Sequence, residues 1–423
     1  MITEAQLAAI RAAHPVDEMA RQWVKLRRYR RGYIGPCPIC STDPDKRGAT
    51  KFECDSDTWK CAVCHNGGDV IELVARRNGL DFKGAVEWLG GAGEVKITRE
   101  IARRAGQRAH KDGQALGDVP APYGDDPALR VAYVAGWSEA RKRAEYETFA
   151  RERERRRLYE FWRAGRYSMP PPITDHYLAG RGIAAPDDAM LRFHPDMPYF
   201  GDGREREPRL IHRGPAMLAA ILSAEGRFAG LHITWLAPDL RAKAQILQPD
   251  AGELLPSKKV RGSKAGGYID LGGCSPGDAS RMIAGEGIET VLSVYTAMLR
   301  AGRDLSRTLF RSAIDLGNLA GRATETVAHP TNKTATGRAQ RVPGPTSDKT
   351  SPAMPVPASI TELVLLGDGD SDAFTTRAAM MRAEARHAAP GRTVRVVFAP
   401  DGLDFNDLIK RNRAASLREG TDA

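Results

Sequence analysis

Cys37-Pro38-Ile39-Cys40 and Cys61-Ala62-Val63-Cys64 are two Cys-x-x-Cys motifs that decide the fold of the N-terminal part of this chain. Four thiolates at this spacing can meet around one Zn²⁺ with tetrahedral geometry. A segment this short buries too little apolar surface to be stable alone, so the metal supplies its stability. The motifs therefore predict a zinc ribbon with one structural Zn²⁺ held by Cys37, Cys40, Cys61 and Cys64.

Two further residues near these motifs are candidate ligands of a weaker kind. Cys54 lies between the motifs and is interpreted as a spare buried thiol, and His65 directly follows the last cysteine and is not expected to bind the metal. A contribution from either one stays open at this stage.

The composition limits the class of protein. A chain of 423 residues is expected to form two to four domains. Its formal net charge of +10 favours a polyanionic partner. It has neither an apolar run long enough to cross a membrane nor the basic and apolar regions of a signal peptide, so we expect a cytoplasmic protein without a membrane partner. Its six cysteines are then expected to be thiols or metal ligands.

The order of motifs predicts a multidomain α/β and α+β protein. Residues 1–93 are expected to form the zinc-binding domain, with one helix over residues 1–30 and another that begins at Asp69 as N-cap. Residues 94–165 are interpreted as a linker, to about residue 125, followed by a charged helix. That helix is interpreted as a solvated element held by pairs of opposite charge, with binding to a phosphate backbone as the alternative.

The second half of the chain is expected to contain two more folded parts. Residues 166–275 are predicted to form a basic α+β subdomain, in which strand-like segments at Ala216–Ser223 and Phe228–Leu236 are joined by a turn that contains Gly226. Residues 276–415 are predicted to form an α/β domain, because strand-like and helix-like segments alternate there as in a mostly parallel sheet. Residues 322–359 are rich in Pro, Thr, Ala and Lys and are interpreted as a surface insertion or a disordered loop.

Acidic residues follow two strand-like segments of the α/β domain. Glu286 ends one apolar segment, and Asp368, Asp370 and Asp372 end another. Carboxylates at the carboxyl ends of parallel strands suit Mg²⁺ or Mn²⁺, and phosphoryl transfer needs such a site. An EF-hand is excluded because the sixth and twelfth positions of its loop would be alanines. A solvated turn with helix-capping aspartates remains the alternative.

A basic, glycine-rich stretch precedes the α/β domain. Its cations are Lys258, Lys259, Arg261 and Lys264. Such side chains can bind a template backbone or the triphosphate of a nucleotide, and an exposed charged loop is an equal alternative.

The N-terminal part of the chain resembles a known protein family. The cysteine motifs, together with Trp59-Lys60 and with the run Gly67-Gly68-Asp69-Val70-Ile71, resemble the zinc-binding domain of bacterial and phage DnaG-type primases over about residues 15–90. That family commonly has His as its second zinc ligand, where this chain has Cys40.

The C-terminal part, about residues 280–412 without the insertion, resembles the Toprim fold of primases, topoisomerases and some nucleases. The resemblance implies metal-binding and catalytic roles for Glu286, Asp368 and Asp370, and for Asp404 in the run Gly402-Leu-Asp404-Phe-Asn406-Asp407. Primases often carry Asp four residues after the glutamate, where this chain has Thr290 with Glu289 beside it. Residues 166–275 resemble, more loosely, the basic subdomain of phage- and plasmid-type primases.

The resemblance implies a DNA primase for DNA replication: a nucleotidyltransferase that makes short RNA primers from ribonucleoside triphosphates on a single-stranded DNA template. A Toprim-type nuclease and a DNA-binding protein without catalysis are the alternatives. The chain has no Gly-Lys dipeptide and so no P-loop, and the replicative helicase is therefore expected to be a separate protein.

Overall fold

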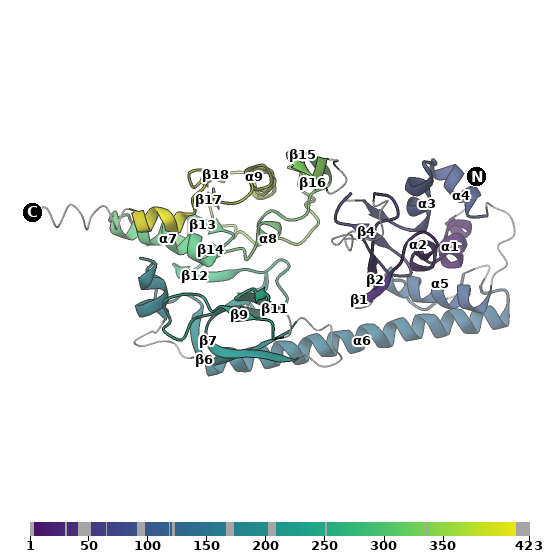
Figure 1. The fold of residues 1–423 in the computed structure, drawn as a ribbon, viewed down its shortest axis with the longest axis horizontal. Helices are drawn as coiled ribbons and strands as arrows, with labels where there is room; N and C mark the ends of the chain where they lie inside the picture. The colour runs from purple at the N-terminus through teal and green to yellow at the C-terminus, as the bar shows by residue number, and fades with distance from the viewer. Residues whose placement is uncertain are drawn as a thin grey trace, which may run out of the picture. The chain divides into compact units, whose positions relative to one another are not determined.

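The computed structural model describes residues 4–29, 32–40, 52–64, 66–90, 98–117, 119–120, 123–165, 173–201, 209–249, 252–334, 337 and 339–411. The chain divides into two compact units (Figure 1). The N-terminal unit comprises Met1–Ala150 with Ala328–Arg341, and the C-terminal unit comprises Arg151–Val327 with Val342–Ala423. Within the described ranges, no helix is both long enough and apolar enough to span a membrane.

The N-terminal unit is built around one antiparallel sheet in the order β1-β2-β3-β4-β5. Its strands are β1 (Arg27–Tyr29), β2 (Gly32–Gly35), β3 (Phe52–Cys54), β4 (Trp59–Cys61) and β5 (Gly67–Gly68). The helices of this unit are α1 (Glu4–Ala13), α2 (Val16–Arg21), α3 (Val70–Asn78), α4 (Phe82–Trp88), α5 (Arg99–Lys111) and the first part of α6 (Pro127–Ala164).

One buried cluster joins the sheet to the helices that flank it. Phe52 and Trp59 stack with ring centroids 5.7 Å apart, and they pack with the apolar face of α3. Asp69 caps α3 by accepting a hydrogen bond from the backbone N–H of Glu72 at 3.0 Å, which confirms the predicted N-cap. Arg11 from α1 donates to the other carboxylate oxygen of Asp69 at 2.6 Å.

Two expectations for this unit were wrong in part. The single helix predicted over residues 1–30 is interrupted, because Pro15 precedes α2 with an extended backbone, and residues 27–29 are a strand. The segment expected to be a linker contains α5, which Thr98 caps and which packs against α1 and α6. Gly106 of α5 and Gly136 of α6 let these two helix backbones touch.

The C-terminal unit contains a four-stranded antiparallel sheet in the order β11-β8-β7-β6. These strands are β6 (Leu191–Phe200), β7 (Leu210–Leu222), β8 (Phe228–Trp235) and β11 (Lys258–Gly262), preceded by the π-helix η1 (Ile173–Leu178) and accompanied by the short pair β9 (Ile246–Leu247) and β10 (Leu254–Leu255). Strands β7 and β8 form the predicted hairpin, with Gly226 in its turn.

A five-stranded sheet follows, in the order β12-β14-β13-β17-β18. Its strands are β12 (Ile269–Gly273), β13 (Arg281–Gly285), β14 (Thr308–Ser312), β17 (Glu362–Gly367) and β18 (Thr393–Phe398), and its helices are α7 (Ile288–Arg300), α8 (Leu316–Ala320) and α9 (Ala373–His387). Strands β14, β13, β17 and β18 pair in parallel, and β12 pairs antiparallel with β14. Helix α7 packs against β13 and β14, and α9 packs against β17 and β18 (Figure 1).

The two sheets of this unit share one core. Alternate residues of β7 point to opposite faces, so Met217 packs in the cluster that also contains Ile283 of β13, whereas Leu218 packs against Trp162 of α6. The basic subdomain and the α/β part expected from the sequence therefore form one packed body.

The expected insertion at residues 322–359 carries ordered structure. It contains the strands β15 (Thr326–Lys333) and β16 (Ala339–Pro343), which pair in a two-stranded sheet. Arg382 of α9 donates to the carbonyl of Gly344, and Arg386 donates to the carbonyls of Asp348 and Ser351. These bonds anchor residues 344–351 to α9.

Candidate functional site

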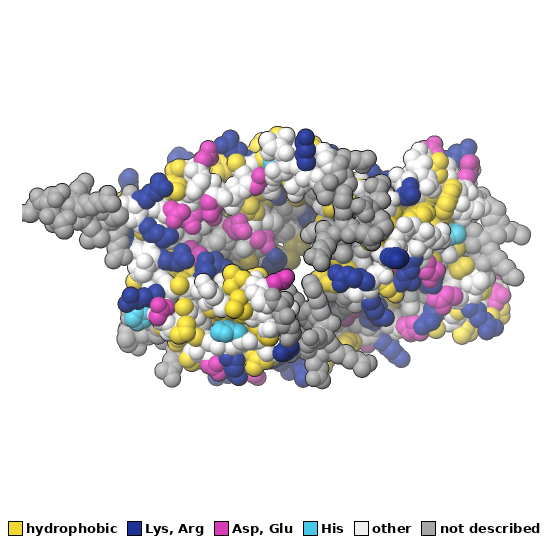
Figure 2. Space-filling view, viewed as in Figure 1, with side chains coloured by type: hydrophobic (Ala, Val, Ile, Leu, Met, Phe, Trp, Pro, Cys, Tyr) yellow, Lys and Arg dark blue, Asp and Glu magenta, His cyan; other side chains and the backbone are white. Residues whose placement is uncertain are grey.

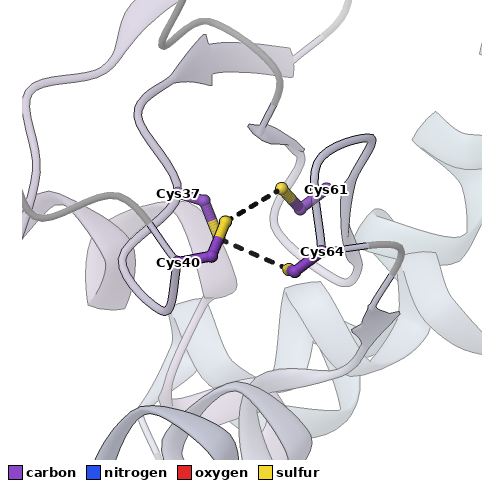
Figure 3. Close-up of side chains that lie close together, drawn as sticks. All are labelled: Cys37, Cys40, Cys61 and Cys64. Carbon is purple, nitrogen blue, oxygen red and sulfur yellow. Dashed lines mark hydrogen bonds between the residues drawn. The ribbon is translucent and has the colours of Figure 1, made fainter. Parts of the chain in front are cut away.

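The four predicted cysteines come together in the N-terminal unit (Figure 3). Their sulfur atoms all lie within 4.8 Å of one another, with 3.9 Å between Cys37 and Cys64 and 3.7 Å between Cys40 and Cys61. Tetrahedral zinc with Zn–S bonds of about 2.3 Å places its sulfurs about 3.8 Å apart. The cluster therefore has the size of a zinc site without rearrangement.

The local sequence explains this geometry. Each Cys-x-x-Cys motif makes a tight turn in which a backbone N–H points at the first sulfur, from Ile39 to Cys37 and from Val63 to Cys61. Strand β3 pairs with both β2 and β4, and this pairing brings the two turns together.

Cys54 lies outside the cluster, buried in β3 opposite Trp59. Burial raises the pKa of its thiol to about 12, so it stays protonated at neutral pH. This matches its interpretation as a spare buried thiol. His65 lies outside the described residues.

A second group of polar residues lies at the carboxyl ends of the parallel strands in the C-terminal unit. Glu286 follows β13, Asp368 and Asp370 follow the neighbouring β17, and Asp315 follows β14 on the other side. Three adjacent strands therefore deliver carboxylates to one edge of the sheet. Asp315 was not predicted from the sequence, because it lies three residues after the end of β14, where it caps α8.

The carboxyl groups of Glu286 and Asp368 are partly buried and are close enough to repel each other. Burial, and after it the charge of Asp368, raises the pKa of Glu286 to about 7. Burial together with Asp370 and Asp404 raises the pKa of Asp368 to about 6, although a hydrogen bond from Thr290 opposes this rise. A cation would relieve both effects, because it favours the ionised carboxylates.

Thr290 supports the carboxylate of Asp368 directly. Its hydroxyl lies 3.0 Å from Oδ2 and 3.2 Å from Oδ1 of Asp368, and its side chain is buried in the first turn of α7. A neutral hydroxyl donor, and not a further carboxylate, therefore contacts Asp368 from the first turn of α7.

Two of the predicted acidic residues have structural partners. Asp372 accepts the backbone N–H of Thr375 at 2.8 Å and so caps α9, as the capping alternative describes. Asp404 accepts the backbone N–H of Asp407 at 2.7 Å, at the start of the helical turns over residues 405–411. The buried Asn406 bonds to the backbone of Arg181 at 2.9 Å and ties this segment to the preceding subdomain.

The four predicted basic residues separate into two pairs because they lie on or beside a strand, not in a loop. Lys258 and Lys264 point to the acidic edge, where they pair with Glu289 and Asp315. Lys259 lies 4.0 Å from the ring centroid of Tyr199 and donates to the carbonyl of Phe200, while Arg261 pairs with Glu154 of α6. Lys259 and Arg261 therefore contact β6 and α6 on the other face of β11.

Glu289 forms ion pairs with the cations that face the acidic edge. Its carboxylate lies 3.1 Å from Nζ of Lys258, 3.4 Å from Nζ of Lys243 and 3.9 Å from Nε of Arg181. The hydroxyl of the fully buried Tyr177 also donates to it. Burial alone would raise the pKa of Glu289, yet Lys258, Lys243 and Arg181 lower it to about 2.

Lys243, Arg181 and Tyr177 were not predicted from the sequence, because they lie in segments without a charge run or a recognisable motif. We call Lys243, Lys258 and Arg181 the cation cluster. Figure 2 shows acidic and basic side chains next to each other on one face of this unit.

The two candidate sites differ in how closely their ligand atoms are gathered. Within the described residues, the cysteines are the one group of three or more His, Cys, Asp or Glu whose ligand atoms all lie within 4.8 Å. The carboxylates of the acidic edge are spread more widely. They offer hard oxygen ligands, but a divalent ion would have to draw them together.

Comparison with known proteins supports the assignment of the N-terminal unit. Residues 2–105 match the DnaG zinc-ribbon family, described as CHC2 zinc finger, and residues 152–271 match a domain of unknown function, DUF7146. A DNA primase of Streptomyces coelicolor is 28% identical over 116 residues, which are 27% of this chain and 17% of that protein. The chain thus matches less than a fifth of the length of this curated relative.

Solved structures of primases resemble this chain with low TM-scores. The zinc-binding and RNA polymerase domains of the Aquifex aeolicus primase share 14% identity with a TM-score of 0.30, covering 97% of this chain and 83% of that one. A DnaG primase catalytic domain bound to single-stranded DNA shares 13% identity with a TM-score of 0.33, covering 64% and 82%. The family match and the cysteine geometry together show that the N-terminal unit contains a zinc ribbon of the type found in DnaG primases, with one structural zinc ion.

Proposed function

We propose that this chain is a DNA primase that joins ribonucleotides on a single-stranded DNA template. The observation that carries the proposal is the arrangement at the carboxyl edge of the parallel sheet, where Glu286, Asp368 and Asp370 adjoin the cation cluster, in a chain with a primase-type zinc ribbon. Residues 276–411 would then form a Toprim-type domain of the phage or plasmid kind.

The acidic edge fits a divalent metal by its chemistry. Glu286, Asp368 and Asp370 would hold Mg²⁺ or Mn²⁺, with Asp404 nearby, because carboxylates are the ligands that these ions prefer. A cation would also relieve the burial and mutual repulsion of Glu286 and Asp368. The bound ion supplies positive charge to the reacting phosphate and its leaving group. Asp372 would act from its capping position at α9 and is the weakest member of the set.

The chain's own residues perform the binding steps. Thr290 orients the carboxylate of Asp368, and the cation cluster binds the triphosphate of the nucleotide. Lys264 belongs on the same side, through its pair with Asp315. No protein nucleophile is needed, because the attacking group is the 3′-hydroxyl of the growing primer.

The zinc ribbon offers a surface for nucleic acid. Tyr29, Tyr33 and Lys60 are among the residues that line a hollow of about 330 Å³ on its sheet. Aromatic rings beside a cation suit stacked bases and a phosphate backbone. We assign contact with the template or the new primer to this surface.

Primer synthesis on single-stranded DNA with ribonucleotides and Mg²⁺ tests the proposal. Short, template-dependent products are expected from the wild type and not from Glu286→Gln or Asp368→Asn. Glu362→Gln is the matched control, because this glutamate pairs with Arg281 at the opposite end of the same strands. Acid-dependent cutting of the DNA without primers would replace the proposal with a nuclease.

DNA binding without either reaction, including in the presence of a replicative helicase, would indicate a non-catalytic binding protein.

A further inference from the structure

We propose that Glu289 is a positioning residue, whose buried carboxylate anchors Lys243, Lys258 and Arg181 as one cluster for the triphosphate of the nucleotide. This inference rests on the proposed function, and it separates Glu289 from the neighbouring acids. Those acids would hold a metal, whereas Glu289 contacts cations.

The geometry of Glu289 supports an anchoring role. Its side chain is 14% exposed, whereas the side chains of Arg181, Lys243 and Lys258 are 24%, 31% and 39% exposed. The carboxylate therefore lies beneath the three cations and leaves them accessible to solvent. One negative and three positive charges leave the cluster with a net charge of about +2 for a phosphate ligand.

The cations need this anchor because they repel one another. Burial, opposed by Glu289 and reinforced by Lys258, lowers the pKa of Lys243. Without the carboxylate, two lysines and an arginine would share a partly buried space, and the flexible lysines would turn toward solvent or lose a proton.

Tyr177 holds the anchor itself. Its ring is fully buried, and its hydroxyl donates to Oε1 of Glu289, while the two lysines contact Oε2. The two oxygens thus have separate partners, and the hydroxyl of Tyr177 sets the orientation in which Oε2 meets the lysines.

Charge and position make opposite predictions for Glu289→Gln. If only net charge mattered, removing a negative charge would tighten the binding of an anion. If the carboxylate positions the cations, binding weakens although the site becomes more positive. Tyr177→Phe separates the two effects further, because it loosens Glu289 without changing any charge.

The test is calorimetric binding of inorganic tripolyphosphate to the full chain, without divalent metal and at constant ionic strength. Lys243→Met and Lys258→Met should each weaken binding about tenfold. Glu289→Gln and Tyr177→Phe should weaken it by a similar factor, Glu289→Asp should restore part of the loss, and Glu362→Gln should leave it unchanged. Thermal unfolding of each variant identifies those that no longer fold.

Tighter binding by Glu289→Gln, or wild-type binding by a folded Tyr177→Phe, would overturn the inference. So would wild-type protein that does not bind tripolyphosphate. In primer synthesis, Tyr177→Phe should raise the nucleotide KM about tenfold and keep kcat. The proposed function fails separately, if the wild type makes no primers while the binding pattern holds.

Discussion

Replacement of Thr290 by Val should weaken divalent-metal binding at the acidic edge in a pH-dependent way. The exchange keeps the shape of a buried side chain and removes the hydroxyl that lies 3.0 and 3.2 Å from the two oxygens of Asp368. That hydrogen bond favours the ionised carboxylate, so its loss raises the pKa of Asp368 above its present value of about 6.

The size of the effect follows from the strength of the bond. A hydrogen bond to a charged group contributes about 1.5–3 kcal/mol, which would raise the pKa of Asp368 to about 7–8. The ionised fraction at pH 7 would then fall from about 0.9 to between about 0.5 and 0.1. We expect Mn²⁺ affinity to fall about twofold to tenfold at pH 7 and to recover near pH 9, where the carboxyl is ionised in both proteins.

Electron paramagnetic resonance of free Mn²⁺ measures this affinity without any need for catalysis, once the zinc site is filled. Thr290→Ser keeps the hydroxyl and should bind as the wild type does. Thr296→Val is the matched control, because Thr296 lies buried on the same helix and bonds to the carbonyl of Leu292. Equal affinities of Thr290→Val and wild type at pH 7, or a deficit that persists at pH 9, would refute the reasoning.

Three further predictions concern zinc, packing and pH. Cys61→Ser should lose the bound zinc and unfold the ribbon, whereas Cys54→Ser should keep one zinc per chain. Elemental analysis measures the zinc and circular dichroism the folding, and loss of zinc from both variants would identify Cys54 as a ligand. Gly136→Ala should lower the free energy of unfolding by about 1–3 kcal/mol, because the new Cβ would lie 1.9 Å from the carbonyl oxygen of Arg103. A free energy of unfolding equal to that of the wild type, measured with denaturant, would contradict the close contact between the two helices. Glu289→Gln should lower the free energy of unfolding by about 3 kcal/mol at pH 7, because the pKa of Glu289 in the folded state, about 2, lies below its ordinary value. This stabilisation is present above about pH 4.5 and is lost as the pH falls toward 2. A difference between variant and wild type that does not change with pH in urea titrations would contradict the prediction.

Much of the fold could be predicted where the signal is local. The N-cap at Asp69, the hairpin around Gly226 and the order of strands and helices after residue 280 depend on neighbouring residues, and the structure has them as expected. The prediction failed where a single residue overrode a longer pattern. Pro15 interrupts a helical spacing that otherwise runs through residues 1–30.

The basic residues show a second limit of sequence reasoning. If a run of cations is interpreted as a loop, the directions of its side chains cannot be predicted. In an antiparallel strand, consecutive side chains of the same run point to opposite faces of the sheet. Lys258 and Lys259 are adjacent in sequence, and the first meets Glu289 while the second meets Tyr199. Their roles were therefore decided by the pairing of β11 with β8, which the charge pattern does not contain.

The cation cluster could not be found from sequence because its members come from three separate segments. Arg181 follows η1, Lys243 lies in the connection after β8, and Lys258 begins β11, whereas the carboxylate they share lies on α7. Only the common core of the two sheets brings these segments to one edge. The acids of that edge directly follow their strands and form motifs, so the candidate metal ligands could be predicted from the sequence. The proposed phosphate-binding groups could not, because tertiary packing brings them together.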